Sequence, residues 1–199
     1  MTITENLNQP KILEFGVSER GMSTEFFINL CNQKDGKLIS VDINDKCKKF
    51  DNNFWTFINT RDDNFLKIEK LIKNEKFDVI YLDTIHKADH VEKIFYHYFK
   101  FLKSGGNFFI DDTSCLPYLK SREKNNFSQE INNHETFYKI LEIYNENHEI
   151  LDLEFSFVGT GVAKIKKLHE GTIKKPKKIK YRKYSIKNIL RKLYLKIKN

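Results

Sequence analysis

The chain has 199 residues, enough for one domain with a sizeable core, and its 40% hydrophobic and 14% aromatic content excludes disorder throughout. No apolar run is long enough to cross a membrane, and residues 1–11 lack the charged and then apolar order of a secretory signal. Three cysteines without a metal-binding spacing favour a reducing compartment over a disulfide framework, so we expect a cytoplasmic protein.

The formal net charge of +8 is distributed unevenly along the chain. Twelve of the 35 Lys and Arg residues, but only one of the 27 acidic residues, lie in residues 170–199, which therefore carry a charge of +11. The other 23 basic and 26 acidic residues give residues 1–169 a charge of −3. This contrast predicts a mildly acidic domain over 1–169, followed by a basic linker and helical tail over 170–199.

Apolar runs alternate with helical patterns from residue 11 onward. Short, nearly continuous apolar runs predict strands at 11–17, 37–43, 54–59, 77–83 and 107–112. Apolar residues at every third or fourth position predict helices at 23–33, 63–74 and 88–106. Ser23 is the expected cap of the first helix, and Gly105 and Gly106 are expected to end the third.

The segment after the fifth strand, 113–133, is polar and is expected to form a loop or short helices over the site. A helix at 134–147 follows, and then a strand pair at 149–158 and 161–167. Alternating strands and helices with apolar strands are typical of an α/β fold with both sheet faces covered. We therefore expect a Rossmann-like, doubly wound sheet, mostly parallel, with an antiparallel C-terminal strand.

Acidic residues or glycine stand at the carboxyl ends of four of the five predicted strands. They are Glu14 with Gly16, Asp42, Asp83, and Asp111 with Asp112. Ligands of such sheets bind outside the carboxyl ends of the strands. We therefore expect these residues at the functional edge of the sheet.

The segment LEFGVSERGMST, residues 13–24, connects the first strand to the first helix. Its glycines allow the backbone to approach a ligand closely, and Asp42, about twenty residues further on, can accept both ribose hydroxyls of a nucleoside. Glu14 would repel a phosphate, so a ligand with an amine and a sulfonium fits better than a dinucleotide. The alternative is a tight turn beside an acidic strand end.

Glu14-x-Gly16, Gly21-x-Ser23-Thr24, Asp42 and the fourth strand FDVIYLD together resemble the class I S-adenosylmethionine-dependent methyltransferases, over about residues 10–167. The resemblance implies that Glu14 and Gly16 lie beside the methionine part and that Asp42 holds the ribose. It also implies that Asp62 or Asp63 lies near the adenine. The remaining implied cofactor-binding residues are Gly21, Ser23 and Asp83. The glycine loop is one residue longer than the family pattern, so Glu19 or Arg20 must bulge.

Asp83-x-x-His86 after the fourth strand and Asp111-Asp112 after the fifth resemble the metal-dependent sugar O-methyltransferases of the macrocin and mycinamicin kind. This likeness implies that Asp83, Asp111 and Asp112 bind Mg²⁺ and that Asp83 and His86 are catalytic, with His86 as general base. The same residues support this chemistry by themselves, since neighbouring carboxylates repel one another unless a cation joins them. Capping of the next segment is the alternative for Asp111-Asp112.

The spacing of His86 and His90 also fits two zinc ligands on one helical face. The metalloprotease pattern requires Glu directly after the first histidine, and Lys87 stands there, so we exclude zinc. We expect His90 to be a polar residue of the helix, with a contact to the substrate as the alternative.

The tail from 185 to 198 spaces apolar residues at helical intervals between basic ones. This pattern predicts a peripheral helix that docks on an anionic membrane surface or on a partner subunit, ahead of RNA binding.

The leading hypothesis is a Mg²⁺-assisted, S-adenosylmethionine-dependent O-methyltransferase that acts on a hydroxylated small molecule or a saccharide. The acceptor pocket is expected from 113–133, with a neighbouring subunit of a homo-oligomer as a second source. The alternatives are a catalytically inactive nucleoside-binding scaffold of the same fold and an RNA methyltransferase recruited by the tail.

Overall fold

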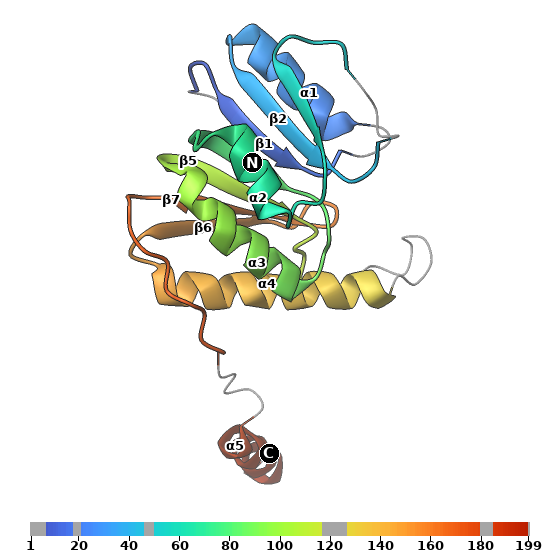
Figure 1. The fold of residues 1–199 in the computed structure, drawn as a ribbon. Coiled ribbons are helices and arrows are strands. Elements are labelled where there is room, and N and C mark those ends of the chain that lie inside the picture. The colour runs from blue at the N-terminus through green and yellow to red at the C-terminus, as the bar shows by residue number, and fades with distance from the viewer. Residues whose placement is uncertain (1–6, 18–20, 46–49, 117–126, 180–184, 199) are drawn as a thin grey trace.

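The structure is a computed structural model that describes residues 7–17, 21–45, 50–116, 127–179 and 185–198. In the described residues, seven strands form one sheet in the order β3-β2-β1-β4-β5-β7-β6 (Figure 1). Their bounds are β1 Lys11–Phe15, β2 Lys37–Asp42, β3 Trp55–Asn59, β4 Phe77–Leu82, β5 Leu102–Asp111, β6 Leu151–Ser156 and β7 Val162–Lys167. Strands β1 to β5 are parallel, whereas β7 runs antiparallel to both β5 and β6.

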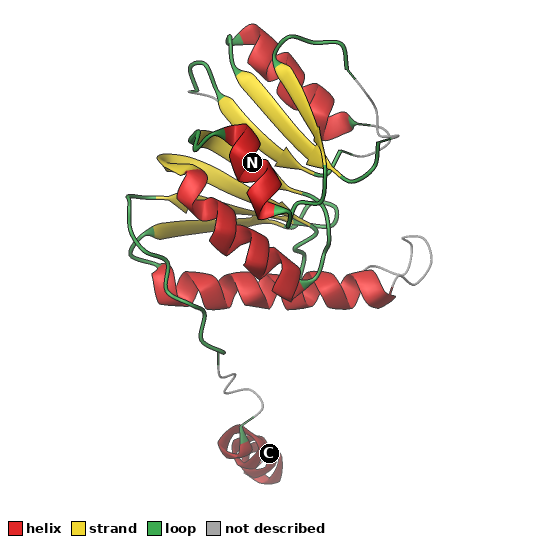
Figure 2. Cartoon of the chain, viewed as in Figure 1, coloured by secondary structure: helices red, strands yellow, loops and turns green. Residues whose placement is uncertain are grey.

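Helices cover both faces of this sheet (Figure 2). They are α1 Met22–Gln33, α2 Phe65–Ile72, α3 Ala88–Tyr98, α4 Phe127–Asn147 and α5 Ile186–Lys198, with a short 3₁₀ helix at Phe99–Phe101. Side chains of α1 pack with Ile12, Leu38 and Val79 on one face. The neighbouring strand residues Leu13 and Ile80 point to the opposite face, where they pack with α2, α3 and α4. The predicted fold class, a Rossmann-like doubly wound sheet, is therefore confirmed.

Two predicted boundaries are wrong. The third helix was expected to continue to Gly105 and Gly106, but α3 ends at Tyr98 and both glycines lie within β5. The pairing of β4 with β5 shifts between Phe77 and Val79, so β5 holds extra residues there, and Gly105 has a φ of 82°. The last long helix begins at Phe127, within the segment predicted to be irregular.

The basic segment after β7 first runs along the domain. Tyr96 and Asn147 both donate to the backbone oxygen of Lys174, at 2.6 and 2.9 Å, and the Lys174 amide donates to Asn147 at 2.7 Å. Helix α5 then lies apart from the sheet and its helices (Figure 1). The division of the chain at residue 169 stays a prediction.

Candidate active site

A glycine turn connects the end of β1 to the loop before α1. Gly16 has a φ of +96°, a conformation that favours glycine, and its amide donates to the Val41 oxygen at 2.9 Å. A Cβ atom at this position would lie only 1.8 Å from the backbone oxygen of Asp83. The turn therefore packs directly against the end of β4, and a side chain at Gly16 would separate the two segments.

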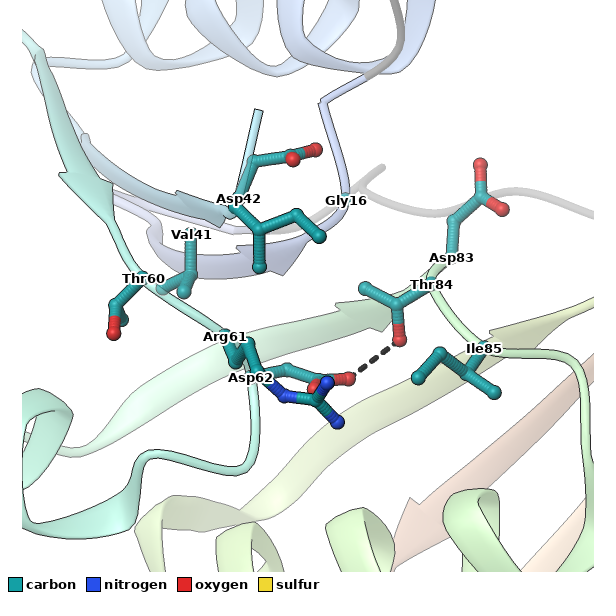
Figure 3. A pocket seen from close by; sticks show the side chains of 10 residues that line it. Gly16, Val41, Asp42, Thr60, Arg61, Asp62, Asp83, Thr84 and Ile85 are labelled. Atoms are coloured by element: carbon teal, nitrogen blue, oxygen red, sulfur yellow. Dashed lines mark hydrogen bonds between the residues drawn. The ribbon is translucent and has the colours of Figure 1, made fainter. Parts of the chain in front are cut away.

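A cavity of about 270 Å³ opens at the carboxyl ends of β1 to β4 (Figure 3). It is lined by Gly16, Val41, Asp42, Ile43, Thr60, Arg61, Asp62, Asp83, Thr84 and Ile85. Four of the predicted site residues are among them: Gly16, Asp42, Asp62 and Asp83. The structure thus brings together residues that are up to 67 positions apart in the sequence.

Asp42 is held in place by two backbone amides. Its Oδ2 accepts from the Val17 amide at 2.6 Å and its Oδ1 from the Asn44 amide at 2.7 Å. The first bond ties the glycine turn to the end of β2. This position beside Gly16 is compatible with the predicted contact to ribose hydroxyls, which stays a prediction.

Asp62 and Asp63, which the sequence left as alternatives, have different surroundings. The Asp62 side chain is buried, and its Oδ2 accepts from the Thr84 hydroxyl at 2.5 Å and lies 2.7 Å from His90 Nε2. Asp63 instead pairs with Arg61 at 2.9 Å and with Lys93 at 3.2 Å, and hydrogen bonding to Arg61 lowers its pKa. Asp62 lines the cavity and Asp63 does not.

His90 is the residue that the sequence reasoning undervalued. It was expected to be a polar residue of the helix, yet its side chain is almost buried and pairs with Asp62 at the cavity. The tertiary contact joins residues 28 positions apart. One feature of the sequence could have indicated a role at the site. His90 lies on the first turn of the helix that follows Asp83 at the end of the fourth strand.

Glu14 lies behind the glycine turn and is not among the residues that line the cavity. Its fully buried carboxyl group accepts from Ser23 and Thr24, both at 2.8 Å, and from Ser40 at 2.6 Å. Burial, opposed by these three hydrogen bonds, raises its pKa to about 7. Glu14 thus connects β1 and β2 to the start of α1, and a direct contact with the methionine part stays a prediction.

The expected capping role of Ser23 is wrong. Gly21, with a φ of 59°, is the N-cap residue of α1, and Ser23 lies inside the helix with its hydroxyl turned to Glu14. Neither Gly21 nor Ser23 is among the residues that line the cavity. The predicted bulge at Glu19 or Arg20 lies outside the described residues.

The remaining acids meet around His86. Its Nε2 lies 3.5 Å from Asp83 Oδ1 and 3.4 Å from Asp112 Oδ2. Asp111 accepts from the Tyr81 hydroxyl at 3.3 Å. Strand β5 ends at Asp111, and Asp112 has a φ of 57°, so the alternation of a regular strand stops between the two residues.

These carboxylates affect one another electrostatically. Burial first and the charge of Asp111 second raise the pKa of Asp83 to about 6, while His86 lowers it. Burial also raises the pKa of Asp111, while a hydrogen bond from the Asp112 backbone lowers it and the charge of Asp112 raises it. Clustered carboxylates of this kind suit a hard divalent cation. However, no group of three or more His, Cys, Asp or Glu side chains in the described residues is arranged to hold a metal ion.

Comparisons with known proteins agree with this architecture. A family model described as a methyltransferase domain matches residues 13–113. A search of curated proteins finds no match. The SAH-bound methyltransferase PaMTH1 of Podospora anserina superimposes with a TM-score of 0.60 at 16% identity, over 79% of this chain and 71% of that protein.

Of two further solved structures, one contains Mg and the other is of a proposed O-methyltransferase. The MycE methyltransferase of the mycinamycin biosynthetic pathway, in complex with Mg and SAH, gives a TM-score of 0.58 at 17% identity, over 93% of this chain but only 50% of MycE. A proposed caffeoyl-CoA O-methyltransferase from Staphylococcus aureus gives 0.57 at 17% identity, over 79% and 76% of the two chains. At these identities the likeness shows the fold.

Proposed function

Since the chain belongs to the methyltransferase-domain family, we propose that it transfers a methyl group from S-adenosylmethionine to a hydroxyl oxygen of a small molecule or a saccharide, with the assistance of Mg²⁺. One observation carries the proposal. Gly16, Asp42 and Asp83 line a single cavity, and His86 lies between Asp83 and Asp112 at its edge.

The cavity supplies the groups that a nucleoside with a sulfonium needs. Asp42 is oriented by two amides and is close to the glycine turn, so it can accept from the ribose hydroxyls. Asp62 is the better adenine contact of the two acids, because Asp63 lies outside the cavity. Asp83 places negative charge near the donor, and a positively charged sulfur is attracted to it.

His86 is positioned to take the proton of the acceptor hydroxyl. As oxygen bonds to the methyl carbon and the carbon–sulfur bond breaks, the hydroxyl proton moves to His86 Nε2. Asp83 and Asp112 then stabilise the imidazolium, which lies within 3.5 Å of each. Asp83, Asp111 and Asp112 are not arranged around one point in the structure, so they would have to move together to hold Mg²⁺. When bound there, Mg²⁺ would lower the pKa of an acceptor hydroxyl. MycE is a protein of this fold whose complex contains Mg.

Calorimetry with SAH tests the cofactor site. We expect Asp42→Asn to weaken SAH binding at least tenfold, because a charged acceptor of two ribose hydroxyls is lost. Asp63→Asn is the control, because Asp63 does not line the cavity, and it should leave the affinity within about twofold. Equal losses of SAH affinity in the two variants, or no SAH binding by the native chain, would contradict the proposed binding site.

Activity then tests the catalytic assignment. Release of SAH is measured with a panel of diols, phenols and glycosides, with and without Mg²⁺. His86→Ala should lower turnover by about 10²–10⁴ with little change in SAH affinity. Asp112→Asn should remove any dependence on Mg²⁺. Unchanged turnover in His86→Ala would refute its role as general base.

The alternatives give different results in the same assays. An inactive scaffold would bind SAH but turn over no hydroxyl acceptor, and its SAH affinity would not respond to Mg²⁺. An RNA methyltransferase would bind RNA in a salt-dependent manner that disappears on truncation at Gly171. The loop that motivates the scaffold alternative, 18–20, lies outside the described residues.

A further inference from the structure

Helix α5 separates apolar and basic residues around its circumference. At roughly 100° per residue, one side of the helix carries Ile186, Ile189, Leu190, Leu193 and Ile197. Lys187 and Arg191 follow one edge of this apolar side, and Lys192 follows the other. Leu195 stands on the opposite, polar side. The helix therefore presents an apolar stripe bordered by positive charge on both edges.

The apolar stripe is exposed in the structure. The exposed fractions of its side chains are 51% for Ile189, 52% for Leu193, 59% for Leu190, 76% for Ile186 and 85% for Ile197. The chain before α5 is fixed to the domain as far as Ile179, whose amide donates to Glu142 at 3.1 Å, and Lys177 pairs with Glu146 at 2.8 Å. The described segment that precedes α5, up to Ile179, is therefore anchored on α4.

We propose that α5 binds the surface of an anionic lipid bilayer and lies in its plane. The apolar stripe would enter the boundary between headgroups and acyl chains, while the flanking Lys and Arg side chains contact anionic headgroups. Charge complementarity extends past the helix, because residues 171–199 contain twelve basic residues and no acidic one. A tail of this composition fits an extended negative surface.

The part of α5 in the structure is shorter than a membrane span. Its 13 residues span about 20 Å, against a hydrocarbon thickness of about 30 Å. Across the described residues, the structure contains no helix with the length and hydrophobicity of a membrane span. Lys187, Arg191 and Lys192 within the helix favour the bilayer surface over the hydrocarbon interior.

Other binding partners would match the apolar stripe or the basic residues of α5, but not both. A second copy of α5 packed against the stripe would bring Lys187 and Lys192 of both copies together at the edges, where like charges repel. Nucleic acid would neutralise the basic residues but leave the apolar stripe in water. A lipid surface with anionic headgroups accommodates both features.

Co-sedimentation of the full chain with vesicles tests the proposal. We expect binding to vesicles of phosphatidylcholine with about 30% phosphatidylserine, and at least tenfold weaker partitioning into pure phosphatidylcholine. Leu193→Ser on the stripe and Arg191→Glu at its edge should each reduce partitioning at least tenfold. Leu195→Ser, the same change on the opposite side of the helix, should alter it by less than about twofold. SAH binding, unchanged in all three variants, separates this test from that of the proposed function.

Three outcomes would overturn the membrane assignment. The first is no binding to anionic vesicles by the native chain. The second is an equal effect of Leu193→Ser and Leu195→Ser. The third is a concentration-dependent dimer in analytical ultracentrifugation, or an RNA complex, that Leu193→Ser abolishes while vesicle binding persists.

Discussion

Gly16→Ala is the substitution that most directly tests how the cavity is built. The added Cβ atom would lie 1.8 Å from the Asp83 backbone oxygen, so the end of β4 must move by about 1.2 Å to restore even a tight contact of about 3.0 Å. Gly105→Ala is the matched control. Gly105 also has a positive φ, 82° against 96° for Gly16, but a Cβ there meets no atom within 4 Å.

The two variants share one energetic term and differ in another. Alanine at a positive φ costs about 1–2 kcal/mol at either position. At Gly16, separation of the segments also weakens two hydrogen bonds: Gly16 to Val41 at 2.9 Å, and Asp83 to Phe15 at 2.8 Å. At about 0.5–1.5 kcal/mol for each bond, the total loss for Gly16→Ala becomes about 2–5 kcal/mol.

Thermal unfolding and SAH calorimetry measure these losses. We expect Gly16→Ala to lower Tm by about 4–20 °C and Gly105→Ala by about 2–8 °C. A displaced Asp83 should also weaken SAH binding at least about thirtyfold in Gly16→Ala, equivalent to about 2 kcal/mol, with no change in Gly105→Ala. Equal Tm shifts together with native SAH affinity in both variants would refute the close approach of the turn to β4.

Two further substitutions probe the buried acids of the site. Because the pKa of Glu14 is raised from 4.5 to about 7 in the folded chain, its contribution to stability is complete below pH 4.5 and is lost as the pH rises through 7. Urea unfolding between pH 5 and 8 should therefore show that the free energy of unfolding of the native chain falls by up to about 3 kcal/mol relative to that of Glu14→Gln. A difference between the two chains that is constant with pH would contradict this. His90→Ala should weaken SAH binding by about 1–3 kcal/mol in calorimetry, because Asp62 loses a buried partner. Lys93→Ala, which removes a partner of Asp63 outside the cavity, should leave the affinity within about twofold, and equal effects would refute the role of His90.

The strands could be predicted from the sequence because each is short, apolar and closed by a polar residue or glycine. Their carboxyl ends form one edge in any parallel sheet, so the grouping of Asp42 with Asp83 followed from the fold class. The start of β5 could not be predicted in this way. Leu102 continues the apolar pattern of α3, and only its pairing with Phe77 across the sheet makes it a strand residue.

Within the site, the orientation of side chains was harder to predict from the sequence than the grouping of the strand ends. Adjacent acids such as Asp62 and Asp63 are equivalent in the sequence, and their roles separate only because Thr84 and His90 approach one and Arg61 and Lys93 approach the other. These partners come from different segments of the chain. Spacing within a motif carries no information about such contacts, so both acids remained candidates.

The acids at this sheet edge also explain which kind of ligand the fold can accept. Each has a different type of partner: three hydroxyls for Glu14, two backbone amides for Asp42, a histidine for Asp83 and a phenol for Asp111. Hydroxyls and amides orient a carboxylate without supplying a counter-charge, so the edge has a negative field where its acids are ionised. Glu14, with a pKa of about 7, is only partly ionised at neutral pH. A phosphate-bearing dinucleotide would be repelled there, whereas a donor with an ammonium and a sulfonium group is attracted. Burial first and the charge of Asp111 second raise the pKa of Asp83 to about 6, and a bound cation would oppose this shift. The charge of the methyl donor is therefore matched to carboxylates that the protein itself leaves without a full counter-charge.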